Sequence, residues 1–223
     1  MKILALDTAT ENCSAALWID GSVRDLCRQT PREHAALILG MIDQLLAEAG
    51  MRLQHLDAIA FGRGPGSFTG VRLAAAVTQG LAFAADLPVL PVSNLRALAA
   101  LGFLSAPAAE YAHCCADARM GEVYHAIYGR NCRLIGVEQV LPPSSVAWGL
   151  PANATAVAVG QGFAAYSRLA EMAPSGWAVS LPGALPRARD IVSLAAEDLQ
   201  LGLAVPAVQA QPVYLRNNVV TRP

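Results

Sequence analysis

One pattern of residues occurs twice in the chain, at an interval of 110 positions. The first copy is LALDTATENCSAALWIDG (4–21), and the second is CCADARMGEVYHAIYGRN (114–131). Each copy contains an apolar strand, a turn that begins at an aspartate, and a second strand. The matched pairs are Asp7 with Asp117, Ala16 with Ala126, and Trp18 with Tyr128. The recurrence predicts a degenerate duplication, in which two related lobes of about 110 residues each share one pattern.

A change in composition predicts where the two lobes meet. Residues 105–110, SAPAAE, are small, include a proline and show no periodic pattern, which is typical of a hinge. We therefore expect an N-terminal lobe over residues 1–105 and a C-terminal lobe over residues 106–223. A chain of 223 residues, 54% of them hydrophobic, fits one large or two small domains with a buried core.

Hydrophobic periodicity predicts an α/β fold. The chain begins with a meander of three strands and continues with alternating helices and strands, so parallel strands extend an antiparallel ribbon. Each lobe is then a mixed sheet with flanking helices. The predicted strands are 2–7, 13–20, 22–30, 56–62, 87–93 and 155–160, and the predicted helices are 31–49, 71–85, 94–104, 163–173 and 189–202.

Helices 31–49 and 71–85 carry more small and apolar residues than one core stripe needs. Thr30 and Glu33 form a capping box at the start of the first helix. Its predicted core stripe is Ala35, Ile38, Leu39, Ile42, Leu45, Leu46 and Ala49. The additional residues on the two helices are Ala36, Leu37, Gly40, Met41, Ala76, Gly80 and Ala84. We interpret these as a partner interface, because small ridges let helix axes approach closely, and burial inside the lobe is the alternative.

A glycine-rich loop lies between strand 56–62 and helix 71–85. The stretch FGRGPGSFTGVR (61–72) lacks the lysine of a P-loop, and threonine replaces the third glycine of a dinucleotide fingerprint. Two interpretations remain: a tight strand-to-helix turn, or amides that cradle a phosphate. The candidate nucleotide-binding residues, which we regard as vestigial, are Asp7, Gly64, Gly66 and Ser67.

No constellation of residues predicts catalysis or a metal site. The four histidines show no i, i+4 pair, the cysteines form no C-x-x-C pair, and no G-x-S-x-G elbow is present. Asp7 ends an apolar strand, where a carboxylate can hold a magnesium-bound water or bond turn amides. For Asp117, which ends the equivalent strand, the structural role is favoured.

Charge and targeting signals indicate a cytoplasmic protein without a membrane segment. Asp7 interrupts the apolar stretch that a signal peptide would need, and no run reaches about 18 apolar residues. Five cysteines without paired spacing suit a reducing compartment. The net charge is −1 with a single lysine, so direct electrostatic binding of nucleic acid is not expected.

Five stretches of the chain resemble one family. They are ILALDTAT, RGPGSFTGVR, LPVLPVSNLRALA, DARMGEVYHAIY and PVYLRNNVV, in that order and across nearly the whole chain. Together they resemble the TsaB family of bacterial tRNA threonylcarbamoyladenosine biosynthesis proteins. The resemblance implies two lobes of the actin, sugar-kinase and Hsp70 type. It also implies kinship with TsaD, in which the strand after the glycine loop leads into a helix that carries two metal-binding histidines four residues apart. Asn94 and Leu98 stand at those positions here.

The resemblance implies a non-catalytic scaffold subunit. It would act with TsaD and the ATPase TsaE in threonylcarbamoylation of the adenosine next to the anticodon, in tRNAs that read codons beginning with A. It would form a heterodimer with TsaD, a homodimer when alone, and reach tRNA only through the complex. No cofactor of its own is expected, although ATP or ADP can bind in the complex. The alternatives are a sugar-kinase-like enzyme, for which Gly160 and Gly162 supply a second loop, and a metallopeptidase.

Overall fold

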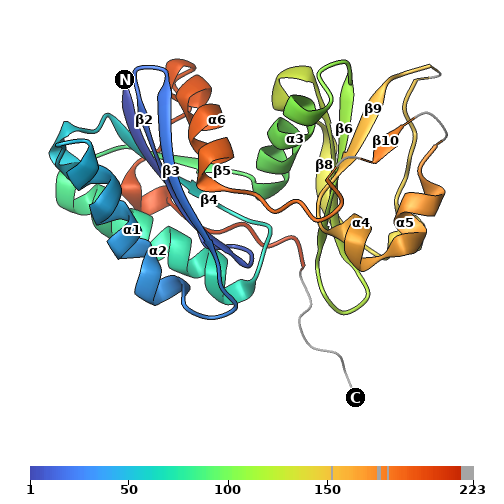
Figure 1. Cartoon of the computed structure of the whole chain (residues 1–223), viewed down its shortest axis with the longest axis horizontal. Coiled ribbons are helices and arrows are strands. Elements are labelled where there is room, and N and C mark those ends of the chain that lie inside the picture. The colour runs from blue at the N-terminus through green and yellow to red at the C-terminus, as the bar shows by residue number, and fades with distance from the viewer. Residues whose placement is uncertain (152, 175–176, 180, 217–223) are drawn as a thin grey trace. The chain divides into compact units, whose positions relative to one another are not determined.

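The computed structural model describes residues 1–151, 153–174, 177–179 and 181–216 (Figure 1). The chain forms two compact units. The first comprises Met1–Ala97 and Pro186–Pro212, and the second comprises Leu98–Leu185 and the chain from Val213 onward. This division differs from the predicted lobes 1–105 and 106–223. The reason is that the last long helix, residues 188–200, packs on the first sheet. A sequence pattern shows that a helix has a buried face, but it does not show which sheet that face covers.

The first sheet has the strand order β3-β2-β1-β4-β5. Its strands are β1 (Lys2–Asp7), β2 (Asn12–Ile19), β3 (Ser22–Gln29), β4 (Ala58–Gly62) and β5 (Val89–Val92). The three N-terminal strands pair antiparallel, and β1, β4 and β5 pair parallel. The predicted ribbon with added parallel strands is confirmed.

Helices cover both faces of this sheet. The first-unit helices are α1 (His34–Glu48), α2 (Phe68–Ala85), the start of α3 (Asn94–Ser105) and α6 (Ala188–Gln200). Side chains from alternate positions of β1, such as Leu4 and Leu6, share one buried cluster with α1 and α2. Helix α6 packs against β1, β2, β4 and β5 from the other face.

Helix α1 buries only part of its predicted core stripe. The helix begins at His34. Just before it, Thr30 Oγ1 accepts a hydrogen bond from the backbone N–H of Glu33 at 3.2 Å. Leu39 was predicted to be buried but is 49% exposed, and Ala35 is exposed as well. The residues of α1 that are buried are Ile38, Ile42, Leu45 and Leu46.

The second sheet repeats the arrangement of the first, with the order β10-β9-β6-β7-β8. Its strands are β6 (Tyr111–Asp117), β7 (Val123–Gly129), β8 (Arg133–Leu141), β9 (Ala156–Val159) and β10 (Ala178–Val179). Strands β6, β7 and β8 are antiparallel, whereas β9 and β10 are parallel to β6. The predicted duplication is therefore confirmed at the level of topology. Asp7 pairs with Ser14 and Asp117 with Val123, so the connecting turn is one residue shorter in the second copy.

Shorter helices complete the chain. Gly102 of α3 lies against Val157 and Val159 of β9, which places the end of that helix in the second unit. Helices α4 (Gly162–Ala165) and α5 (Ser167–Met172) replace the single predicted helix 163–173. The 3-10 turns are η1 (Leu53–His55), η2 (Arg130–Cys132), η3 (Pro143–Ser145) and η4 (Ala207–Gln209).

Helix α2 is the one helix, among the described residues, with the length and hydropathy of a membrane span. It has 18 residues and a mean hydropathy of 1.2, and about a third of it (33%) is buried. Ala74, Ala75 and Ala82 pack into the sheet's core, so packing on one side accounts for part of this apolar character. A sheet-packing helix passes the same test, and the helix does not by itself indicate a membrane.

Candidate functional site

Asp7, at the end of β1, is held by residues of two other segments. Its side chain is fully buried, and Asn94 Nδ2 donates a hydrogen bond to Asp7 Oδ1 at 2.9 Å. Asn94 Oδ1 accepts from the backbone N–H of Gly64 at 2.8 Å, and the Asn94 N–H donates to the Gly64 carbonyl at 3.0 Å. Gly62 leaves no room for a Cβ, which would collide with Asp7 Oδ1. The site is therefore a closely packed polar cluster.

Burial controls the ionisation of Asp7. It raises the pKa of Asp7 from 3.8 to about 7, against hydrogen bonds from Asn94 and two backbone amides that lower it. Burial also raises the pKa of Asp190, in the first turn of α6, to about 6. Oδ2 of each carboxyl has no hydrogen-bond partner within the described residues. Both groups therefore favour the protonated form more than an exposed aspartate does.

The glycine loop packs directly on the turn after β1. A Cβ on Gly66 would lie 2.5 Å from the Ala9 carbonyl oxygen, and a Cβ on Gly70 would collide with the Thr8 carbonyl oxygen. Thr8 Oγ1 donates to the Gly70 carbonyl at 2.7 Å. These glycines are required because backbone meets backbone, and the interpretation of a tight strand-to-helix turn gains a physical basis.

Several amides of the loop already have partners within the chain. The Ser67 N–H donates to the Ala9 carbonyl at 2.7 Å, and the Gly64 N–H is bound by Asn94. Ser67 Oγ accepts from the Gly70 N–H at 3.1 Å and so caps the start of α2. Of the four candidate nucleotide-binding residues, the structure brings Asp7 and Gly64 together through Asn94, whereas Gly66 and Ser67 pack on Ala9.

The candidate interface residues fall into two groups. Leu37 and Met41 are half-buried and pack against the core cluster. The other five are exposed: Ala36, Gly40, Ala76, Gly80 and Ala84. Nothing lies within 4 Å of a Cβ built on Gly40 or Gly80. Sequence periodicity missed Phe83, which is 80% exposed on α2 and adds an aromatic ring to this face.

Two histidines that lack helical spacing meet across β6 and β7. His125 Nε2 lies 3.2 Å from His113 Nδ1, and both rings are buried. Burial lowers the pKa of His113 to about 3 and that of His125 to about 4, and the mutual repulsion contributes at His113. The His113 ring also contacts Trp148 and Trp177, with centroids 5.3 and 4.7 Å away. Both histidines are therefore neutral core residues. The antiparallel register of β6 and β7 brings them together, and that register cannot be read from their spacing in the sequence.

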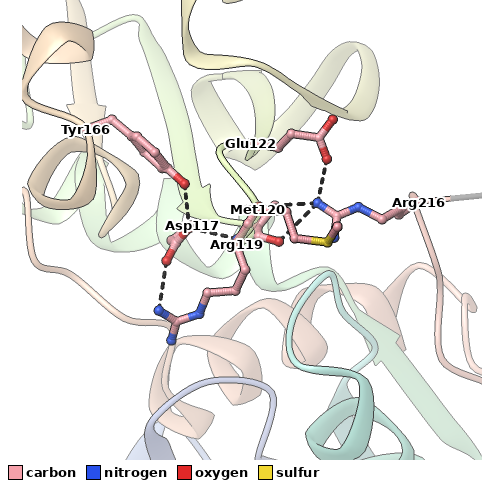
Figure 2. A network of polar contacts seen from close by, with 7 residues as sticks. Asp117, Arg119, Met120, Glu122, Tyr166 and Arg216 are labelled. Carbon is pink, nitrogen blue, oxygen red and sulfur yellow. Dashed lines mark hydrogen bonds and ion pairs between the residues drawn. The ribbon is translucent and has the colours of Figure 1, made fainter. Parts of the chain in front are cut away.

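The turn after β6 carries a second polar network, shown in Figure 2. Asp117 Oδ1 accepts from the Arg119 N–H at 2.8 Å and from the Tyr166 hydroxyl at 3.1 Å. Asp117 Oδ2 pairs with Arg119 Nη1 at 3.0 Å. Arg216 Nη2 donates to Glu122 Oε2 at 2.5 Å. Asp117 has the structural role favoured from the sequence.

Comparisons with known proteins match nearly the whole chain. Residues 27–219 match the family model of TsaD, tRNA N6-adenosine threonylcarbamoyltransferase. Proteins named tRNA threonylcarbamoyladenosine biosynthesis protein TsaB, from Haemophilus influenzae and Escherichia coli, are each 42% identical over 98% of this chain. The matches cover 95% and 96% of those proteins. The chain belongs to the TsaB family.

A solved structure agrees with membership in the TsaB family. YeaZ from Pseudomonas aeruginosa superposes with a TM-score of 0.86 at 45% identity, over 96% of this chain and 99% of that one. The duplicated sheets and the TsaD family match identify the fold as the actin and sugar-kinase type. The structure shows the contacts that three of the TsaB-like motifs make. GPGSFTGVR packs on the first hairpin turn, and DARMGEVY meets Arg216 of PVYLRNNVV.

Proposed function

We propose that this chain is a non-catalytic scaffold subunit in tRNA threonylcarbamoyladenosine biosynthesis, where it supports a transferase subunit of the TsaD type. Family membership supports the place in that pathway. The observation that supports the scaffold role is that Asn94 and Leu98 are buried and pack inside the chain. These residues stand where the resemblance to TsaD implies two metal-binding histidines.

Both residues are committed to packing. Asn94 Nδ2 donates to Asp7, and Asn94 Oδ1 accepts from the Gly64 N–H, so the amide joins the end of β1 to the glycine loop. Leu98 is 1% exposed and has no donor atom. Across the described residues, no group of three or more histidines, cysteines or acids is placed to hold a metal ion. The chain alone is therefore not expected to catalyse threonylcarbamoyl transfer.

The exposed face of α1 and α2 is the proposed contact with the transferase subunit. It carries Gly40 and Gly80, whose Cα atoms are open to an approaching helix, together with exposed Phe83. The same face would pair two copies of this chain when the partner is absent. TsaE and tRNA would join only the assembled complex.

The proposed scaffold needs no cofactor of its own. Loop amides at Gly64 and Ser67 already bond Asn94 and Ala9, which leaves fewer donors for a phosphate. ATP or ADP would be held only in the complex, and the cellular location would be the cytoplasm. A free-standing kinase would instead need the loop to bind nucleotide tightly without a partner.

Reconstitution tests the scaffold role. A TsaD subunit, TsaE, unmodified tRNA and an activated threonylcarbamoyl donor are combined with and without this chain, and modified adenosine is measured by mass spectrometry. Product should require this chain, and the chain with tRNA and donor alone should give none. Product formed equally well without it, or by it alone, would overturn the proposal. Elemental analysis of the purified chain should find no stoichiometric zinc or iron.

A further inference from the structure

The two hairpin turns related by the duplication are held by different segments of the chain. In the first unit, the Ala9 carbonyl accepts from the Ser67 N–H at 2.7 Å, and the Thr8 carbonyl lies against Gly70. The glycine loop thus covers the first two carbonyls of this turn.

At the equivalent positions in the second unit, the carbonyls of Ala118 and Arg119 accept from one guanidinium. Arg216 Nη2 lies 3.1 Å from the Ala118 oxygen and 3.4 Å from the Arg119 oxygen (Figure 2). The glycines after β9 do not take this role, because Gly160 and Gly162 pack on the carbonyl of Cys115. Cys115 lies before the turn, so the glycine segment of this unit covers a different place.

The second turn has an unusual backbone that needs support. Arg119, Met120 and Gly121 follow one another with φ of +60°, +56° and +78°. Left-handed backbone is unfavourable for the two non-glycine residues, and such conformations persist only where surrounding contacts hold them. The described residues of the first turn, 8–11, include no positive φ.

Arg216 is well suited to hold this turn. Its side chain is 17% exposed, and Nη2 also pairs with Glu122 Oε2 at 2.5 Å, while Nη1 lies 3.3 Å from the Met120 sulfur. The contacts to both carbonyls and to Glu122 come from Nη2, at the far end of the long planar guanidinium side chain. Partial burial and the ionised partner strengthen these bonds.

We propose that Arg216 is a latch that replaces the glycine loop in the second unit, holding the turn 118–122 in its left-handed conformation. Arg216 and the turn that it holds belong to the same unit, although they are about 95 positions apart in the chain. The conformation of the turn therefore depends on a residue close to the C-terminus. This inference does not depend on the proposed function.

Residue-resolved hydrogen exchange on the full chain tests the latch. The amides to follow are those of Ala118, Arg119 and Glu122, which donate to Glu122, Asp117 and Arg119 respectively. In Arg216→Ala their exchange should accelerate roughly tenfold or more, while the Ser67 amide in the first unit keeps its wild-type rate. Arg216→Lys should retain only part of the protection, because the lysine nitrogen lies one bond closer to the backbone than Arg216 Nη2 and falls short of the place from which Nη2 contacts both carbonyls.

Two further variants keep the test decisive. Arg130→Ala is the matched control, since Arg130 also donates to a backbone carbonyl, that of Pro107, at 3.0 Å in the same unit. It should leave the turn's exchange unchanged. Glu122→Gln keeps the shape of the pair without its charge and should accelerate exchange at the same amides by a smaller factor. Unchanged exchange at the turn in Arg216→Ala, or equal acceleration across all of β6, β7 and β9, would overturn the latch.

Discussion

The substitution Gly80→Leu tests whether the exposed face of α2 binds a partner or belongs to the core. Gly80 lies in the interior of α2, is exposed, and has nothing within 4 Å of an added Cβ. In the free chain the new side chain meets only solvent, and leucine is favoured over glycine in a helix interior by about 0.8 kcal/mol. For a chain of this size the melting temperature should rise by roughly 2 °C.

In a complex through this face, the same side chain would overpack the contact. Overpacking costs about 1–3 kcal/mol, which corresponds to a loss of affinity of roughly 5- to 150-fold. Gly40→Leu on α1 should behave in the same way, since its Cβ position is equally open.

The assay pairs differential scanning fluorimetry with titration calorimetry against the TsaD subunit. Melting is measured at concentrations where sedimentation shows a monomer, because loss of a homodimer would lower the apparent melting temperature by mass action. Gly149→Leu is the control: this exposed glycine of the second unit also has no atom within 4 Å of its Cβ. It should bind TsaD normally. A melting temperature that falls by several degrees in the Gly80→Leu monomer, or unchanged affinity for TsaD, would refute the interface.

Two other predictions concern the packed site. Gly66→Ala and Gly70→Ala should each reduce the free energy of unfolding by about 1–3 kcal/mol, because the added Cβ meets the backbone of Ala9 or Thr8; denaturant titration measures this, and wild-type stability in both variants would contradict the packing. Isothermal titration should show weak ATP binding before and after these changes, and micromolar binding that either variant abolishes would favour the phosphate cradle. Asp7 has its folded-state pKa raised from 3.8 to about 7, so it binds its proton more tightly when folded, and its contribution to stability is lost as the pH rises between these values. Asp7→Asn should therefore gain stability relative to wild type as the pH goes from 4 to 8, and a difference that does not change with pH would show that Asp7 ionises normally.

Local sequence patterns predicted most elements of the first unit, because short runs of apolar residues and helical periodicity are local features. Helix caps are local in the same way, because each needs only neighbours a few residues away: Ser67 Oγ accepts from the Gly70 N–H, and Ser93 Oγ accepts from the Leu95 N–H at 3.1 Å. Leu39 was misplaced because α1 carries apolar residues on more than one side, and only the sheet decides which side is buried.

Long-range relations could not be obtained from one sequence. The roles of Asn94 and Arg216 depend on contacts with Asp7 and Glu122, which lie 87 and 94 positions away. The meeting of His113 and His125 depends on the register between β6 and β7. The resemblance supplied which motifs matter, but not that DARMGEVYHAIY and PVYLRNNVV contact one another through Glu122 and Arg216.

The interrupted first unit has a consequence for the order of synthesis. A ribosome completes all five strands of the first sheet, with α1 and α2, before it makes α6, which begins at Ala188. Until then, the face of β1 that carries Ile3 and Ala5 lacks the helix that covers it in the finished molecule. The second unit is translated during this interval. The nascent chain therefore exposes an apolar sheet face over about 90 residues of elongation, a period of roughly 5–20 s at bacterial rates, and we expect chaperones that bind apolar segments to act on it at this stage.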